Sequence, residues 1–166
     1  MAGTAERLAV ALPAAAASPW LRRRPPRIAQ AFGAAALLVH AALWGLETPF
    51  GRAPLVGAIG IAAGLGWMVW AAWCFRRAGT TIRPTEVPTR FVDEGPFAYG
   101  RNPMYLGMVV VLLGVGAALG APLLAAAALG FALVMQHVHI PHEEAALKRA
   151  FGGWYIDYAA QVRRWI

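Results

Sequence analysis

Charged residues are scarce in this 166-residue chain, and three long stretches contain none at all. Only 14% of the residues are charged, 59% are hydrophobic, and the mean hydropathy is +0.52. Residues 28–46, 53–75 and 102–142 contain no Asp, Glu, Lys or Arg. Because this composition is too apolar for an ordinary soluble domain, it indicates an integral membrane protein.

Acidic residues are outnumbered by basic ones, 8 to 15, which gives a formal net charge of +7. An excess of this size can indicate nucleic-acid binding. Here, however, the basic residues lie in the segments between the apolar stretches, as they do in membrane proteins. We therefore expect no nucleic-acid partner.

Cysteine is also scarce in the sequence. Cys74 is the only cysteine, which excludes a disulfide within the chain.

The lengths of the uncharged stretches predict the number of membrane crossings. At a rise of about 1.5 Å per residue, each of the first two stretches suffices for one crossing and the third for two. Gly120 and Pro122 lie near the middle of the third stretch, where a helix-ending glycine followed by proline favours a tight turn. We predict helices at 103–119 and 122–140. The predicted fold is an all-α integral membrane bundle with about four transmembrane helices.

Four crossings would bring the three basic segments of the chain to one side of the membrane. These segments precede the first span, separate the second from the third, and follow the fourth, whereas Arg52 lies on the other side. The positive-inside rule makes the basic side cytoplasmic. We therefore predict a multi-pass protein of the inner, or cytoplasmic, membrane with both termini in the cytoplasm.

Small and aromatic residues in the predicted spans suggest how the helices pack. Gly60 and Gly64 are four residues apart, as are Gly116 and Gly120, and each pair can form a small face that allows close helix contact. The tryptophans at 67, 70 and 73 recur towards the predicted cytoplasmic end of the second span. We interpret them as an interfacial anchor.

Polar residues converge at the cytoplasmic ends of the third and fourth predicted helices. Asn102 precedes Pro103, a pattern typical of an N-cap followed by proline at the first helical position. The free N–H groups of such a helix start can stabilise a carboxylate. The alternative is that Arg101, Asn102 and Pro103 form only a favourable helix start with a snorkelling arginine.

A pair of acids, Glu143 and Glu144, follows the fourth predicted helix. Paired acids at a membrane boundary are costly unless they bind a cation or face water. His137, His139 and His142 precede them, but the two-residue spacing of the first two points to different sides of a helix. We therefore predict no metal site. Binding of a cationic or hydroxyl-rich small molecule explains the acids better.

The last segment of the chain follows Gly152 and Gly153 and has apolar residues at helical spacing. It predicts an amphipathic helix on the membrane surface, which would act as an anchor or as a lid over the site. Its apolar face would be formed by Tyr155, Tyr158, Ala159, Val162 and Trp165.

Two segments together resemble a known enzyme family. The first is GTTIRPTEVPTRFVDEGPFAYGRNPMYLG, residues 79–107, and the second is EEAALKRAFGGWYIDYAAQVRRWI, residues 143–166. Their motifs are a Gly-Pro-Phe turn, Arg-Asn-Pro-Met-Tyr at a helix start, a Glu-Glu pair, Phe-Gly-x-x-Tyr-x-x-Tyr and a terminal Val-Arg-Arg-Trp. As a set they resemble the isoprenylcysteine carboxyl methyltransferase family, which is akin to the phospholipid methyltransferases.

This resemblance implies an integral membrane enzyme that transfers a methyl group from S-adenosylmethionine to a lipophilic acceptor such as an isoprenylcysteine carboxylate. The cofactor would bind on the cytoplasmic side, beneath the C-terminal segment, and the acceptor would enter from the bilayer. By the same resemblance, the cofactor-binding residues are Thr89, Arg90, Phe91, Val92, Phe97, Asn102, Pro103, Met104, Tyr105, Glu143 and Glu144.

We select Arg101 and His139 as candidate catalytic residues. Arg101 or a protonated His139 could orient a carboxylate acceptor, whereas a thiol or amine acceptor needs a base, for which His139 or His142 is available. Relatives with a prenyl substrate often carry His at the position of Asn102 and Arg at that of His139, so the acceptor stays open.

The alternatives are a phospholipid amine or small thiol acceptor, or a non-catalytic accessory protein with the same scaffold. The expected partners are membrane lipids and a lipophilic or prenylated substrate. We divide the chain into a cytoplasmic basic leader at 1–27, a two-helix membrane scaffold at 28–75, and a methyltransferase core with a C-terminal segment that covers the cofactor at 76–166.

Overall fold

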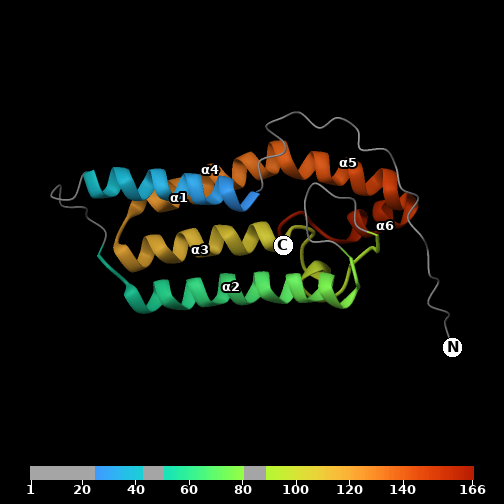
Figure 1. Ribbon diagram of the computed structural model, residues 1–166, viewed down its shortest axis with the longest axis horizontal. Helices are drawn as coiled ribbons and strands as arrows, with labels where there is room; N and C mark the ends of the chain where they lie inside the picture. Colours follow the sequence, from blue (N-terminus) through green and yellow to red (C-terminus); the bar gives the residue numbers. More distant parts are fainter. Residues whose placement is uncertain (1–24, 43–50, 81–88) are drawn as a thin grey trace.

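Helices make up the regular structure of the computed structural model, which describes residues 25–42, 51–80 and 89–166 and contains no strand within them. Four of them form the bundle: α1 (Pro25–Ala42), α2 (Pro54–Arg77), α3 (Pro103–Leu119) and α4 (Pro122–Val134). In the bundle α2 packs on α3, α3 on α4, and α4 on α1 (Figure 1). The predicted all-α class is confirmed.

The third and fourth helices meet at the predicted turn. The boundaries of α3 agree with the predicted 103–119, and Gly120 ends it in the left-handed conformation, with φ of 66°. Glycine adopts this conformation without steric cost, and Pro122 then begins α4 with a residue whose missing N–H is not needed there. The long apolar stretch therefore folds back on itself.

The predicted end of the fourth helix at residue 140 is wrong. After α4 the helix continues through a π-helical turn, η2 (Met135–His139), into α5 (Ile140–Phe151). Pro141 would clash with the carbonyl four residues before it in a regular α-helix. The wider π turn directly before this proline lets the helical path continue. As a result, α5 extends the helix beyond the other helices of the bundle (Figure 1).

Glycines bring α2 and α3 into close contact, as predicted for Gly60 and Gly64. A Cβ added at Gly64 would lie 2.7 Å from the carbonyl oxygen of Gly107, and one at Gly60 would lie 3.2 Å from the Cα of Gly114. The backbones can approach this closely only because side chains are missing. The predicted pair of Gly116 and Gly120 behaves differently, because Gly120 closes the turn instead of extending the helix face.

The outer surface of the bundle is apolar. The helical segments Pro54–Arg77 and Pro122–Phe151 are long and apolar enough to cross a bilayer, and α1 and α3 are shorter apolar helices. On α2, Leu55 is 72% exposed and Val69 is 68% exposed. Such a surface suits hydrocarbon and not water. Near the end of α2, Arg77 lies over the ring of Trp73 at 5.2 Å from its centroid, an arrangement suited to the headgroup level.

Most of the basic residues within the described segments lie at one end of the bundle. The start of α1, the end of α2, the start of α3 and all of α5 are at this end, and Arg52 precedes α2 at the opposite end (Figure 1). The arrangement of the helices therefore agrees with the predicted separation of charge. The leader at residues 1–24 and the loop at 81–88 lie outside the described residues.

We expect Gly57→Ala to weaken the contact between α2 and α3. The new Cβ would lie 2.5 Å from the Cβ of Ala118 and 2.5 Å from the carbonyl oxygen of Gly114. Overpacking of this kind lowers the free energy of unfolding by about 1–3 kcal/mol, which thermal unfolding of the detergent-solubilised protein can measure.

The matched control is Gly66→Ala on the same helix. A Cβ at Gly66 meets no atom of the described residues within 4 Å, and alanine favours helices by up to about 1 kcal/mol over glycine. The control should therefore be neutral or stabilising. Equal unfolding temperatures for the two variants would contradict the proposed close packing.

Candidate functional site

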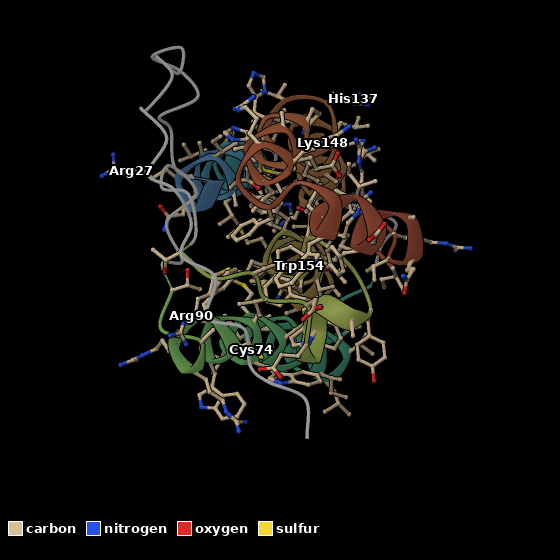
Figure 2. All side chains as sticks on the ribbon, turned by 90° about the vertical axis from the view of Figure 1, so that its right-hand side faces the viewer. Arg27, Cys74, Arg90, His137, Lys148 and Trp154 are labelled. Atoms are coloured by element: carbon tan, nitrogen blue, oxygen red, sulfur yellow. The ribbon has the colours of Figure 1, made fainter. Side chains whose placement is uncertain are left out.

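Three parts of the chain meet at the basic end of the bundle. They are the start of α3 with the residues before it, the helix α5, and the C-terminal segment, which consists of α6 (Gly153–Gln161) and the tail at residues 162–166. The C-terminus lies beside the first turn of α3 (Figure 1). Figure 2 looks onto this end and shows α5 with Lys148 and α6 with Trp154 in front of the bundle.

The tail binds to the backbone just before α3. The N–H of Arg101 donates to the carbonyl of Arg163 at 2.9 Å, and the N–H of Asn102 donates to the carbonyl of Arg164 at 3.1 Å. Gly100 makes room for this pairing, because a Cβ there would overlap the carbonyl of Trp165. The tail is therefore a structural part of the α3 start.

The side chain of Asn102 binds the tail instead of capping the helix. Asn102 occupies the N-cap position, but its side chain makes no capping bond, and its Nδ2 donates to the carbonyl of Arg164 at 2.9 Å. Its own carbonyl accepts from the N–H groups of Tyr105 and Leu106, both at 3.1 Å. The expected side-chain cap is thus wrong, and fewer free N–H groups remain for an anion than we predicted.

Glu144 lies between two arginines. Its Oε1 accepts from Nε of Arg164 at 2.9 Å and lies 3.3 Å from Nη1 of Arg101, and its Oε2 accepts from Nη2 of Arg164 at 2.8 Å. The side chains of Arg101 and Glu144 are only 15% and 19% exposed. The hydrogen bonds that Arg164 donates to Glu144 raise the pKa of Arg164. Two cations therefore share one carboxylate, and Arg101 is paired instead of snorkelling into water.

Glu143 faces the start of α3. The hydroxyl of the buried Tyr105 donates a hydrogen bond to Oε1 of the half-buried Glu143. This contact joins the two segments that sequence analysis selected independently, the Arg-Asn-Pro-Met-Tyr motif and the Glu-Glu pair. It brings together two of the predicted cofactor-binding residues from positions 38 residues apart.

His139 lies deeper in the bundle. It is the last residue of the π turn and is only 4% exposed. Its Nε2 has no hydrogen-bond partner among the described residues, and the same holds for the buried Nε of Arg101. Most buried polar side-chain atoms in proteins are paired, so these two atoms mark a functional candidate. Both belong to the residues we predicted as catalytic.

Aromatic rings join α6 to the loop before α3. The ring of Phe91 lies against those of Phe151, Tyr155 and Tyr158, at centroid distances of 5.3, 6.2 and 5.1 Å. The hydroxyl of Tyr158 donates to the carbonyl of Phe97 at 2.7 Å. Burial raises the pKa of both Tyr155 and Tyr158, so both phenols stay neutral donors at physiological pH.

The remaining predicted cofactor residues fall into two groups. Thr89 and Arg90 are exposed, and both backbone N–H groups donate to Oγ1 of Thr80 after the end of α2. Val92 and Phe97 are buried in a cluster with Ala71 and Cys74, and Met104 packs against it beside the buried Pro103. The second group borders the site, whereas the first is tied to the end of α2.

The predicted amphipathic helix is shorter than expected. It ends at Gln161, and Val162 is extended with φ of −112° and ψ of 130°, so Val162 and Trp165 do not continue its face. Tyr155, which we expected on the membrane surface, is buried against the protein. The backbone pairing with Arg101 and Asn102 accounts for the extended tail.

Sequence reasoning missed the contacts of the tail. Arg164 is part of the Val-Arg-Arg-Trp motif, and the motif gave no indication that it binds Glu144. Trp165 packs against the core around Tyr105 and donates from Nε1 to Oε1 of Gln136 at 2.9 Å. The only sequence signal was the Val-Arg-Arg-Trp motif, which carries no spacing information about its partners.

These features define a helical, membrane-associated protein with a polar site at one end of its bundle. The sequence model of the phospholipid methyltransferase family matches residues 53–153, which include the Arg101 to Tyr105 motif and the Glu-Glu pair. Because the match covers more than half of the chain, the protein belongs to the phospholipid methyltransferase family, a family of membrane methyltransferases. Searches of curated proteins and of solved structures found no match.

We expect Gly100→Ala to detach the tail from the start of α3, because the new Cβ would occupy the position of the Trp165 carbonyl. The amides of Arg101 and Asn102 would then lose their partners and exchange with deuterium faster. Hydrogen exchange of peptides from this segment and from the tail measures the effect.

Gly153→Ala provides the control, since a Cβ there meets no described atom within 4 Å. Exchange in this variant should match that of the unchanged protein. If Gly100→Ala also leaves exchange unchanged, the tail is not bound as described.

Proposed function

We propose that the protein is an integral membrane enzyme that transfers a methyl group from S-adenosylmethionine to a lipophilic acceptor. The family match supports methyl transfer. The hydrogen bond between Tyr105 and Glu143 supports this site as the location of the activity, because it joins the two motifs to which the family resemblance assigns the cofactor. The apolar surface of the bundle supports an acceptor that arrives from the bilayer.

The residues present suit this cofactor, which carries a carboxylate, an ammonium, a sulfonium, ribose hydroxyls and an adenine. Arg101 would hold the carboxylate, because its buried Nε has no partner among the described residues and the two arginines are only half neutralised by Glu144. Glu143 would hold the ammonium or the ribose hydroxyls. Phe97 and Met104 would provide an apolar wall for the adenine.

Glu144 takes a different role from the one the family resemblance implies. Its two carboxylate oxygens are bound by Arg101 and Arg164, so its direct work is to hold these arginines in place. When bound, the cofactor supplies an electrophilic methyl group, and the contribution of the chain is alignment and exclusion of water. The docked tail, with Trp165 packed on the core, serves both purposes.

Two acceptor classes are supported by different observations. The resemblance of the segments 79–107 and 143–166 to the isoprenylcysteine carboxyl methyltransferases favours a carboxylate, such as that of an isoprenylcysteine. The family match and the unpartnered Nε2 of His139 favour a phospholipid amine or a thiol, because these acceptors must lose a proton. Radiolabelled S-adenosylmethionine with a panel of prenylcysteine, phospholipid and thiol acceptors distinguishes the two classes.

We expect S-adenosylhomocysteine, the demethylated cofactor, to raise the unfolding temperature of the detergent-solubilised protein. A ligand at 100 times its Kd adds about 2.7 kcal/mol to the free energy of unfolding. Glu143→Gln should reduce this shift by removing the charge that holds the ligand. Differential scanning fluorimetry over a range of ligand concentrations measures both effects.

Asp157→Asn is the matched control, because Asp157 is an exposed acid on α6. It should leave the ligand-induced shift unchanged. An unchanged shift in Glu143→Gln would remove Glu143 from the site, and no shift in the unchanged protein would favour a non-catalytic accessory role.

We further propose that the basic end of the bundle faces the cytoplasm and that the helices cross the membrane four times. Arg76 and Arg77 end α2, Lys148 and Arg149 lie in the last turn of α5, and Arg163 and Arg164 lie in the tail, all at this end. The positive-inside rule then sets the orientation.

A C-terminal epitope tag should be cleaved by protease in inside-out membrane vesicles and protected in intact spheroplasts. Cleavage in spheroplasts would reverse the orientation.

A further inference from the structure

We infer that His139 accepts a proton from the methyl acceptor, and that the acceptor is therefore a thiol or an amine and not a carboxylate. This inference rests on the proposed methyltransferase function and makes its substrate class definite. A carboxylate is already deprotonated at neutral pH and gives a base nothing to do. A neutral thiol or an ammonium must lose a proton to gain a methyl group.

The burial of His139 is the first observation that supports this role. The side chain is 4% exposed, and its Nε2 has no partner among the described residues. Leaving a buried polar atom unpaired costs free energy, so such atoms persist where a ligand or a reaction uses them. His139 also closes the π turn Met135–His139, and single π turns within helices occur frequently at functional sites.

The position of His139 along its helix is the second observation. Glu143 follows four residues later, so the two side chains share one helix face. Glu143 accepts the hydrogen bond from Tyr105, which places this face towards the start of α3. Ile140, next to His139, packs in the core with Tyr105 and Met135. His139 therefore lies one turn below the polar site, on the side of the hydrocarbon interior.

This depth suits the meeting point of a polar cofactor and a lipophilic acceptor. Glu144 and its arginines lie towards the basic end, Glu143 and Tyr105 follow, and His139 is the next titratable residue along this face.

Titratable groups lie on the elements that pack around His139. His142 and Glu143 lie on its own helix, Tyr105 lies on α3, and Arg27 lies at the start of α1, where Ala29 packs in the same cluster as Ile140. The burial of His139 keeps its ring away from water.

The proposed step transfers one proton and one methyl group. The S–H or N–H proton of the acceptor passes to Nε2 of His139, and the freed electron pair forms the bond to the methyl carbon. The bond between that carbon and the sulfonium sulfur breaks, and its electrons stay on the sulfur. The imidazolium then releases its proton to water.

His137 and His142 do not offer the same chemistry. Both are exposed, and Nδ1 of His142 lies 2.7 Å from the carbonyl oxygen of Val138. Neither combines burial with an unpartnered ring nitrogen. The structure thus selects one of the histidines that sequence analysis left as alternatives.

The test uses the purified full chain with radiolabelled S-adenosylmethionine and three acceptors: a lipid thiol, phosphatidylethanolamine and a prenylcysteine carboxylate. We expect the unchanged protein to methylate the thiol or the amine lipid in preference to the carboxylate. His139→Gln should lower kcat for that acceptor by about 100-fold, the lower range of general base catalysis, with little change in KM. His137→Gln, at an exposed position of the same π turn, should match the unchanged protein.

The pH profile provides a readout that a purely structural role would not move. The rate of the unchanged protein should fall at acid pH, because a protonated Nε2 cannot accept a proton, and this acid limb should be lost in His139→Gln. Stabilisation by S-adenosylhomocysteine should be the same in both proteins, because His139 is not assigned to the cofactor. This thermal measurement reports folding and cofactor binding without turnover.

Each outcome bears on one proposal. Preference for the carboxylate, or full activity of His139→Gln on the thiol or amine, overturns the inference and leaves the methyltransferase function standing. Absence of both methylation and cofactor stabilisation in the unchanged protein overturns the proposed function itself. If His139→Gln does not fold, the acceptor preference and the acid limb of the unchanged protein decide the question.

Discussion

The two adjacent carboxylates at the edge of the apolar bundle need polar partners, and the partners they take determine how this end of the protein is built. A half-buried acid is stable only when hydrogen bonds or cations replace the water it has lost. Glu143 takes the hydroxyl of Tyr105, which fixes α5 against the start of α3. Glu144 takes Arg101 and Arg164, which fixes the tail against both. Three segments distant in sequence are thereby joined.

The close packing of α2 and α3 gives these contacts a firm base. Glycines such as Gly64 and Gly107 let the two helices meet backbone to backbone, so α3 has little freedom to slide. The position of its first turn, with Tyr105, is therefore fixed relative to the buried cluster around Phe97. A polar site that must hold a small molecule in line with a second reactant benefits from such rigidity.

The π turn in the fourth helix connects the membrane part of the molecule with the polar site. It precedes Pro141 and lets the helix continue into α5, which carries Glu143 and Glu144. The same turn holds His139 in the apolar interior and Gln136 under Trp165 of the tail. One local departure from α-helical geometry therefore positions groups for both proposed reactants.

The sequence by itself determined the helical class, the helix at 103–119 and its glycine turn, because uncharged length, proline and glycine act through local backbone physics. It also selected Tyr105, Glu143, Arg101 and His139 as candidates. Only the tertiary structure decided that Asn102 binds the tail instead of capping its helix, that the helix passes through Pro141, and that Glu144 is committed to arginines. These outcomes depend on which distant groups compete for the same hydrogen bonds, and spacing along the chain does not specify that competition.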